Sequence, residues 1–199
     1  MFEEFYKNYS NDLAQTLHKI DSSQMNQLIM RLDEAYQKGR KIFILGNGGS
    51  ASSASHWVCD FGKGINTKNS KRMKIISLSD NVAITTALGN DISYDDVFKY
   101  QLENLAEEGD LVLCLSVSGN SPNLVKAVEY CNEIGCNTIS IIGDYNGALS
   151  SKTKLNITIQ SQNYGIVEDI HLIINHVISQ YLKERNLKLE EETMPIESR

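Results

Sequence analysis

The chain has 199 residues, of which 41% are hydrophobic, a length and composition that fit one domain with a normal apolar core. Its 25 acidic residues outnumber its 19 basic ones and give a net charge of -6, whereas nucleic-acid-binding proteins generally need a basic face to neutralise phosphates. We therefore expect no nucleic-acid partner, and an anionic ligand only at a local site.

Membrane and secretory signals are not evident in the sequence. It contains no run of about 18 uncharged apolar residues, and the N-terminal segment MFEEFYKNYSND is acidic, unlike the basic start of a signal peptide. We expect a cytoplasmic protein with no membrane partner. The cysteines Cys59, Cys114, Cys131 and Cys136 form no CxxC pair, and Cys114 lies in an apolar run, so we expect reduced thiols with no disulfide and no cysteine-based metal cluster.

Residues 1–38 predict a pair of helices. Apolar residues recur at helical spacing from Phe2 to Leu17 and again from Met25 to Tyr36. Between the two segments, Asp21 and the serines that follow it are residue types that cap helix N-termini. The apolar stripes of this pair suit either the core or a subunit interface.

From residue 41 onward, short apolar runs alternate with helical segments. The runs cover residues 41–46, 74–79, 111–118, 137–142 and 155–160. Continuous apolar runs bounded by Gly, Ser and Asp predict buried strands of a parallel sheet with helices on both faces, so residues 41–185 predict a doubly wound α/β core within a single domain. A last helix is expected from about Ile166 to Arg185, with a charged, frayed tail over residues 186–199.

Two loops rich in glycine and serine follow predicted strands, GNGGS at residues 46–50 and SVSGNSP at residues 116–122. Ligands of open parallel sheets bind beyond the carboxyl ends of the strands, where glycine permits close backbone approach and a helix N-terminus attracts anions. Ser121 followed by Pro122 predicts such a helix start. The first loop has neither the lysine of a Walker A sequence nor the spacing of GxGxxG. One such loop is equally compatible with a plain turn, but the two together favour a phosphate site.

Two predicted helices each offer a carboxylate and an imidazole. His56 and Asp60 lie four residues apart on the helix opened by the first loop, while Glu168 and His176 share a face of the last helix. If these faces meet, within a subunit or across an interface, they form either an acid/base set or a His/carboxylate metal site. The alternative is an ordinary solvated helix pair.

Other polar residues have simpler interpretations. His18 and His171 are expected to be histidines without a catalytic or ligand role. The dipeptide Asn90-Asp91 suits either a helix cap or hydrogen bonds to sugar hydroxyls, and the local sequence is compatible with both.

Four segments in order, GNGGSASSASH, GND at residues 89–91, SVSGNS and VEDIHLIINH, resemble the phosphoheptose isomerases of the sugar isomerase (SIS) domain family over residues 1–185. The resemblance implies a three-layer sandwich with a five-stranded parallel sheet, an N-terminal helical pair, and a homotetramer with active sites between subunits. It also implies conversion of D-sedoheptulose 7-phosphate to D-glycero-D-manno-heptose 7-phosphate through an enediol, for the heptose of surface polysaccharides.

The same resemblance implies roles for individual residues. Asp60 would be the general base and His176 the general acid, and a zinc ion would be held by His56, Asp60, Glu168 and His176. The implied substrate-binding residues, which hold the phosphate and sugar, are Asn47, Gly48, Gly49, Ser50, Asn90, Asp91, Ser116, Val117, Ser118, Ser121 and Glu168. Moving a carbonyl between C1 and C2 requires a base and an acid, and a divalent metal would polarise both oxygens.

Three positions depart from the family pattern. The family usually has Glu at the position of Asp60, Gln at that of Glu168 and Thr at that of Val117. Two carboxylates with two histidines favour a metal more than the usual set does. Two alternatives remain, a non-catalytic tetrameric SIS regulator that binds a sugar phosphate or a protein partner, and an isomerase of another phosphosugar.

Overall fold

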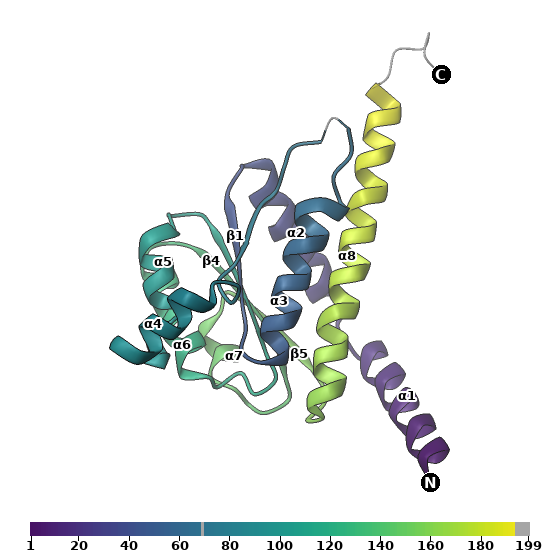
Figure 1. Ribbon diagram of the computed structural model, residues 1–199. Helices are drawn as coiled ribbons and strands as arrows, with labels where there is room; N and C mark the ends of the chain where they lie inside the picture. Colours follow the sequence, from purple (N-terminus) through teal and green to yellow (C-terminus); the bar gives the residue numbers. More distant parts are fainter. Residues whose placement is uncertain (69, 194–199) are drawn as a thin grey trace.

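A five-stranded parallel sheet forms the centre of the computed structural model, which describes residues 1–68 and 70–193 (Figure 1). The strands are β1 Lys41–Leu45, β2 Lys74–Ser77, β3 Leu111–Ser116, β4 Asn137–Gly143 and β5 Leu155–Ile159. Their order is β2-β1-β3-β4-β5, and all four pairings are parallel. The predicted fold class is thereby confirmed. Each predicted apolar run contains its strand, except that β4 continues one residue further, to Gly143.

Helices cover both faces of this sheet. They are α1 Phe2–His18, α2 Ser22–Gln37, α3 Gly49–Cys59, α4 Val82–Asp91, α5 Lys99–Leu105, α6 Pro122–Glu133, α7 Leu149–Lys152 and α8 Tyr164–Thr193, with a π-helical turn η1 at Asp60–Gly64 and a 3-10 turn η2 at Tyr94–Asp96. In Figure 1, α2, α3 and α8 lie on one side of the sheet and α4, α5 and α6 on the other. Within the described residues, no helix combines the length and the apolar character needed to cross a bilayer.

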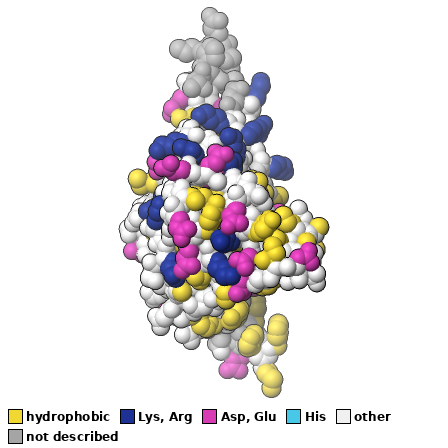
Figure 2. Space-filling view, turned by 90° about the vertical axis from the view of Figure 1, so that its left-hand side faces the viewer, with side chains coloured by type: hydrophobic (Ala, Val, Ile, Leu, Met, Phe, Trp, Pro, Cys, Tyr) yellow, Lys and Arg dark blue, Asp and Glu magenta, His cyan; other side chains and the backbone are white. Residues whose placement is uncertain are grey.

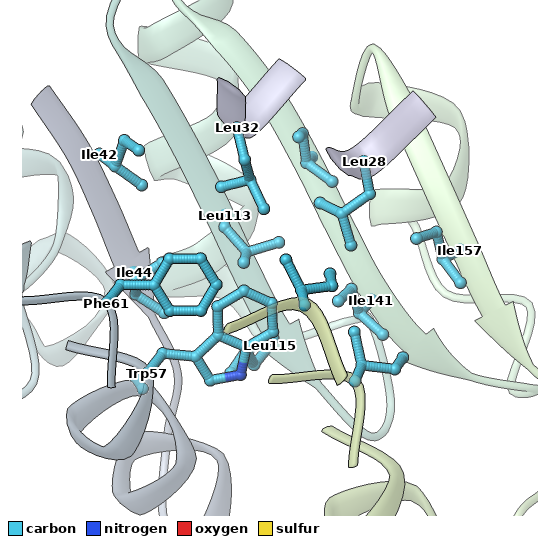
Figure 3. Close-up of a cluster of buried hydrophobic side chains, with 14 of the residues drawn as sticks. Leu28, Leu32, Ile42, Ile44, Trp57, Phe61, Leu113, Leu115, Ile141 and Ile157 are labelled. Carbon is cyan, nitrogen blue, oxygen red and sulfur yellow. The ribbon is translucent and has the colours of Figure 1, made fainter. Parts of the chain in front are cut away.

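Each face of the sheet has its own apolar core, because successive strand residues point to opposite sides. Ile42 and Ile44 of β1 face α2, α3 and α8, whereas Phe43 and Leu45 face α5 and α6. On the first face, Figure 3 shows Trp57 beside Phe61, and their rings stack with centroids 5.2 Å apart and an interplanar angle of 8°. These buried rings fix the end of α3 and the start of η1 against the sheet.

The N-terminal helical pair is present, and Asp21 caps α2 by accepting a hydrogen bond from the backbone N–H of Ser23 at 2.7 Å. Helix α1 extends beyond the rest of the molecule in Figure 1. It is tied to α8 by the Tyr9 hydroxyl, which donates to Asp169 at 2.6 Å. Burial and the neighbouring Asp169 carboxylate raise the pKa of Tyr9 to about 12, so the donor stays protonated. In contrast, Phe2 and Phe5 are 79% and 67% exposed.

Helix α8 differs from its predicted bounds. It begins two residues earlier than expected and continues to Thr193, so residues 186–193 are helical where a frayed tail was predicted. The reason is packing against the segment that follows η1. Asn186 donates to the Ile65 carbonyl at 3.1 Å, and Thr67 donates to Glu190 at 2.6 Å. The rest of the predicted tail, residues 194–199, lies outside the described residues.

The four cysteines are free thiols in the described structure. Cys59 is exposed, and Cys114, Cys131 and Cys136 are buried. Burial raises the pKa of Cys114 to about 12, which keeps this thiol protonated at neutral pH.

Candidate active site

A small polar cavity lies where β1 and β3 end side by side. The strand order reverses here, because β2 lies on one side of β1 and β3 lies on the other. Open α/β sheets bind ligands at such switch points. The cavity has a volume of about 120 Å³ and is lined by Asn47, Ser50, Leu115, Ser116, Val117, Ser118, Ser121, Tyr164 and Glu168. The structure therefore brings together most of the residues expected to bind phosphate.

The backbone around the first loop leaves donors available to this cavity. Gly48 is the N-cap of α3 with φ +56°, a conformation that glycine adopts without strain. The first turn of α3 consequently begins at the cavity, where its free N–H groups and positive dipole end favour an anion. Gly48 and Gly49 themselves belong to this loop rather than to the cavity lining.

The second loop adds hydroxyl groups. The Ser116 Oγ accepts a hydrogen bond from the Gly119 N–H at 3.0 Å, and the Ser118 Oγ accepts one from the Asn120 N–H at 3.2 Å. Since each hydroxyl accepts from the backbone, its own proton remains available to donate. Ser121 is the N-cap of α6 but makes no side-chain cap bond, so its hydroxyl is also uncommitted. Among the described residues, neither Lys nor Arg lines the cavity, and its donors are neutral groups and helix ends.

Glu168 lines the polar cavity, although it was also expected among the metal ligands. Its carboxylate packs directly against Gly49, so closely that a Cβ at residue 49 would collide with both carboxylate oxygens. The carboxylate thus lies beside the positive end of α3, a favourable place for negative charge. The group of possible metal ligands found in the described residues does not include Glu168.

The other three expected ligands, His56, Asp60 and His176, do come together. The Nε2 atoms of His56 and His176 are 3.0 Å apart, and they lie 3.4 and 3.6 Å from the Asp60 Oδ2. One ligand atom from each residue lies within 4.8 Å of the others. Asp60 stands at the junction of α3 and η1, and π-helical turns of this kind are frequent at functional sites. The two helix faces thus meet within one chain at these three residues.

The donor set of this cluster fits a metal such as zinc. Two imidazole nitrogens facing each other need a proton or a cation between them, since two lone pairs repel. Three nitrogen and oxygen ligands with one side open to solvent are the usual protein contribution to a catalytic zinc site. The side chains of His56 and His176 are 45% and 46% exposed, so a substrate can reach the cluster.

Asn175 holds the Asp60 carboxylate of this cluster, and it was not predicted from the sequence. It is fully buried and donates from Nδ2 to the Asp60 Oδ2 at 2.6 Å. The hydrogen bond fixes the carboxylate, much as outer ligand partners orient metal-binding groups. The available signal was an asparagine beside His176 within the apolar stretch LIINHVI.

Two further missed residues contact Asn47. Asn123, the second residue of α6, exchanges two hydrogen bonds with the Asn47 side chain, and the Tyr94 hydroxyl donates to the same side chain.

Asn90 and Asp91, by contrast, are exposed at the end of α4, and their side chains hydrogen-bond to each other at 2.7 Å. Neither lines the phosphate cavity.

The two remaining histidines match their simpler interpretations. His171 is completely buried and its Nε2 lies 3.0 Å from the Ile141 carbonyl oxygen. Burial lowers the pKa of His171 to about 4, so the ring is neutral and donates this bond. His18 is exposed in the last turn of α1.

The phosphate cavity and the metal-ligand cluster lie along one seam between α3 and α8. On α3, Ser50 lines the cavity and His56 follows six residues later, which corresponds to about 9 Å along a helix. On α8, Glu168 and His176 are eight residues apart, or about 12 Å. The same two helices therefore carry the polar cavity near their N-terminal ends and the cluster of His56, Asp60 and His176 two to three turns further along.

Comparison with known proteins shows the family of the chain. The SIS domain profile matches residues 5–143. A phosphoheptose isomerase from Pelobacter propionicus is 36% identical over 160 residues, covering 80% of this chain and 84% of the relative. A probable phosphoheptose isomerase from Thermoplasma acidophilum is 32% identical over 179 residues, covering 90% and 98%.

A solved structure agrees in fold. The phosphoheptose isomerase from Neisseria gonorrhoeae superposes with a TM-score of 0.84 at 22% identity, covering 92% of this chain and all of that one. Together with the sequence matches, this places the chain among the phosphoheptose isomerases, and it belongs to the SIS domain family.

Proposed function

We propose that the protein isomerises D-sedoheptulose 7-phosphate to D-glycero-D-manno-heptose 7-phosphate for heptose biosynthesis. The observation that carries the proposal is the seam between α3 and α8, with an anion cavity at one end and the cluster of His56, Asp60 and His176 further along. The relatives named as phosphoheptose isomerases, which match most of the chain, support the same reaction.

The reaction requires one proton to move between neighbouring carbons. Asp60, held by Asn175, would take the proton from C1 of the ketose and return it to C2. His176 would protonate the C2 oxygen as the enediol forms, and its neutral ring would then take the proton of the C1 hydroxyl as the aldehyde forms, which restores both groups. The cavity residues would hold the phosphate and fix C1 and C2 beside these two groups.

We further propose one zinc ion per site, held by His56, Asp60 and His176. When bound, zinc would supply the polarisation of the substrate oxygens that the His176 proton supplies without the metal, because a metal-bound imidazole nitrogen carries no proton. The proposal is supported by the convergence of the three ligand atoms. Because Glu168 packs against Gly49, we assign it to the substrate cavity rather than to the residues that would hold zinc.

For the assembly we propose a homotetramer with sites near subunit interfaces. The proposal is supported by the exposed apolar stripe of α1, which includes Phe2, Phe5 and Tyr6. Isolated surface apolar residues are ordinary, but an exposed stripe on one helix that extends from the body is typical of an interaction surface.

The deciding experiment measures aldose formation from sedoheptulose 7-phosphate before chelation, after chelation and after zinc is restored. Turnover that falls on chelation and returns with zinc is expected. Asp60→Asn and His176→Gln should each lower kcat by about 10²–10⁴-fold, the usual contribution of a general base or acid. His18→Gln, a change at an exposed histidine, is the matched control and should leave kcat unchanged.

Zinc binding is measured separately by titration of the metal-free protein. His56→Ala should weaken zinc binding, and His18→Gln should not. Full activity in the Asp60 and His176 variants would contradict the proposed catalytic roles. Phosphate binding without turnover would favour another phosphosugar substrate or a non-catalytic regulator.

A further inference from the structure

We propose that Asn123 and Tyr94 are positioning residues of the phosphate site, which together hold the side chain of Asn47 in one orientation toward the cavity. The inference rests on the proposed function, since it concerns the same phosphate-binding end of the seam. Neither residue lines the cavity, so each acts through Asn47 rather than by touching a ligand.

The contact between the two asparagines is reciprocal. The Asn47 Nδ2 donates to the Asn123 Oδ1 at 2.9 Å, and the Asn123 Nδ2 donates to the Asn47 Oδ1 at 3.0 Å. Asn123 is only 1% exposed, so water cannot replace a lost partner on its side. Breaking the pair would leave buried amide groups without hydrogen bonds, which is costly.

Tyr94 adds a third hydrogen bond to this pair. Its hydroxyl donates to the Asn47 Oδ1 at 3.0 Å, so this oxygen accepts two hydrogen bonds. Flipping the Asn47 amide alone would place its NH₂ against the Asn123 NH₂ and its oxygen against the Asn123 oxygen, so the pair resists rotation of either amide by itself. In the observed arrangement one Nδ2 hydrogen of Asn47 is used, and the second is left to donate to a ligand.

The arrangement also joins three separate segments of the site. Asn47 belongs to the loop after β1, Asn123 to the first turn of α6 after the β3 loop, and Tyr94 to η2. Asn123 is 76 residues from Asn47 in sequence, and Tyr94 is 47 residues from it. The Asn47 amide therefore links the loop after β1 to the start of α6. Tyr94 links the segment that follows Asp91 to the same amide.

Tyr94→Phe is the sharpest variant, because it removes only one hydroxyl from a residue that is 55% exposed. Loss of a hydrogen bond of this kind should weaken binding of inorganic phosphate, measured by calorimetry, by about 3- to 10-fold. The KM for sedoheptulose 7-phosphate should rise by a similar factor, and kcat should stay within about twofold, because the proton-transfer residues are untouched.

Tyr100→Phe is the matched control. Tyr100 is 42% exposed on α5, and its hydroxyl makes no hydrogen bond within the described part of the chain, so this variant should bind phosphate like the wild type. Asn123→Leu, which keeps the side-chain size but removes both bonds, should weaken phosphate binding more than Tyr94→Phe. If Asn123→Leu does not fold, Tyr94→Phe alone decides.

A double-mutant cycle separates positioning from direct contact. In an Asn47→Ala background, Tyr94→Phe should cause no further loss of phosphate binding, because Asn47 is the group that Tyr94 positions. An equal loss in both backgrounds, or wild-type phosphate binding by Tyr94→Phe, would overturn the inference. Phosphate binding without isomerase turnover would remove the proposed reaction and leave the inference standing, whereas a wild-type protein that binds no phosphate would overturn both.

Discussion

His171 and His176 lie five residues apart on α8 and meet opposite environments. His171 is fully buried and hydrogen-bonded to the Ile141 carbonyl, while His176 is about half exposed in the ligand cluster. Helical geometry explains the difference, since a step of five residues turns a side chain by about 140° around the axis. One histidine therefore contributes to packing, and the other is accessible to a ligand.

The buried imidazole makes stability depend on pH. The pKa of His171 falls from 6.5 to about 4 on burial, so between these values the unfolded chain binds a proton that the folded chain does not. Unfolding free energy should consequently decrease as pH falls through 6.5, with a loss of about 2 kcal/mol at pH 5 relative to pH 7. Urea unfolding at the two pH values measures this.

The matched comparison uses two histidine variants. His171→Asn should lose this part of the pH dependence, although it is itself less stable, whereas His18→Asn should keep the wild-type dependence because His18 is exposed. An unchanged difference between pH 7 and pH 5 in His171→Asn would show that another group is responsible.

Among individual residues, those of the His56, Asp60 and His176 cluster were easier to predict from the sequence than the asparagines that hydrogen-bond to site residues. The spacing of His56 and Asp60 on one helix face follows from local geometry, so the pair was visible. Asn175 and Asn123 contact their partners across 115 and 76 residues of sequence, and those contacts depend on tertiary packing. Glu168 was expected both at the substrate site and among the metal ligands, because helical spacing gives a face but not the position along a partner helix; it lines the cavity.

Among the elements, the strands were the most predictable. The three inner strands, β1, β3 and β4, are buried on both faces of the sheet almost throughout, and such runs are distinct from the surrounding sequence. The end of α8 was not predictable for the opposite reason. Its charged sequence after Arg185 resembles a tail, and only the bonds of Asn186 and Glu190 to the segment after η1 explain why the helix continues.

This extension yields a stability prediction. Asn186→Ala removes the hydrogen bond to the Ile65 carbonyl from a residue that is 6% exposed, and should lower the free energy of unfolding by about 1–2 kcal/mol. The exposed Lys188, two residues further along the same helix, provides the control, because Lys188→Ala should change it by less than about 0.5 kcal/mol. Denaturant unfolding compares the two, and equal stabilities would refute the role given to Asn186.

On the scale of the whole molecule, the surface is uneven. The face that carries α4 and α5 shows Lys and Arg side chains interspersed with Asp and Glu (Figure 2). Helix α1, in contrast, exposes Phe2, Phe5 and Tyr6 in one stripe. Mixed charge suits a solvated surface, whereas the apolar stripe suits contact with another copy of the chain.

The proposed homotetramer predicts a particle of four times the 22.3 kDa chain mass in sedimentation equilibrium. Phe2→Ser combined with Phe5→Ser should shift the mass toward smaller species, because it removes exposed apolar area from α1. Leu105→Ser, at a residue of α5 that is 41% exposed, should leave the mass unchanged. A wild-type chain that sediments as a monomer would exclude the tetramer.

The seam between α3 and α8 restricts how this protein can change its substrate over evolution. Inserting a single residue between Ser50 and His56 would rotate the imidazole by about 100° and turn it away from Asp60 and His176. Only insertions of about one whole helical turn keep His56 facing Asp60 and His176. Each such turn lengthens the separation between the cavity and the cluster by about 5.4 Å. The two helices thus allow the separation between the cavity and the cluster to change only in steps of about one helical turn. Substrates of intermediate length would have to be accommodated by changes in loops and side chains alone.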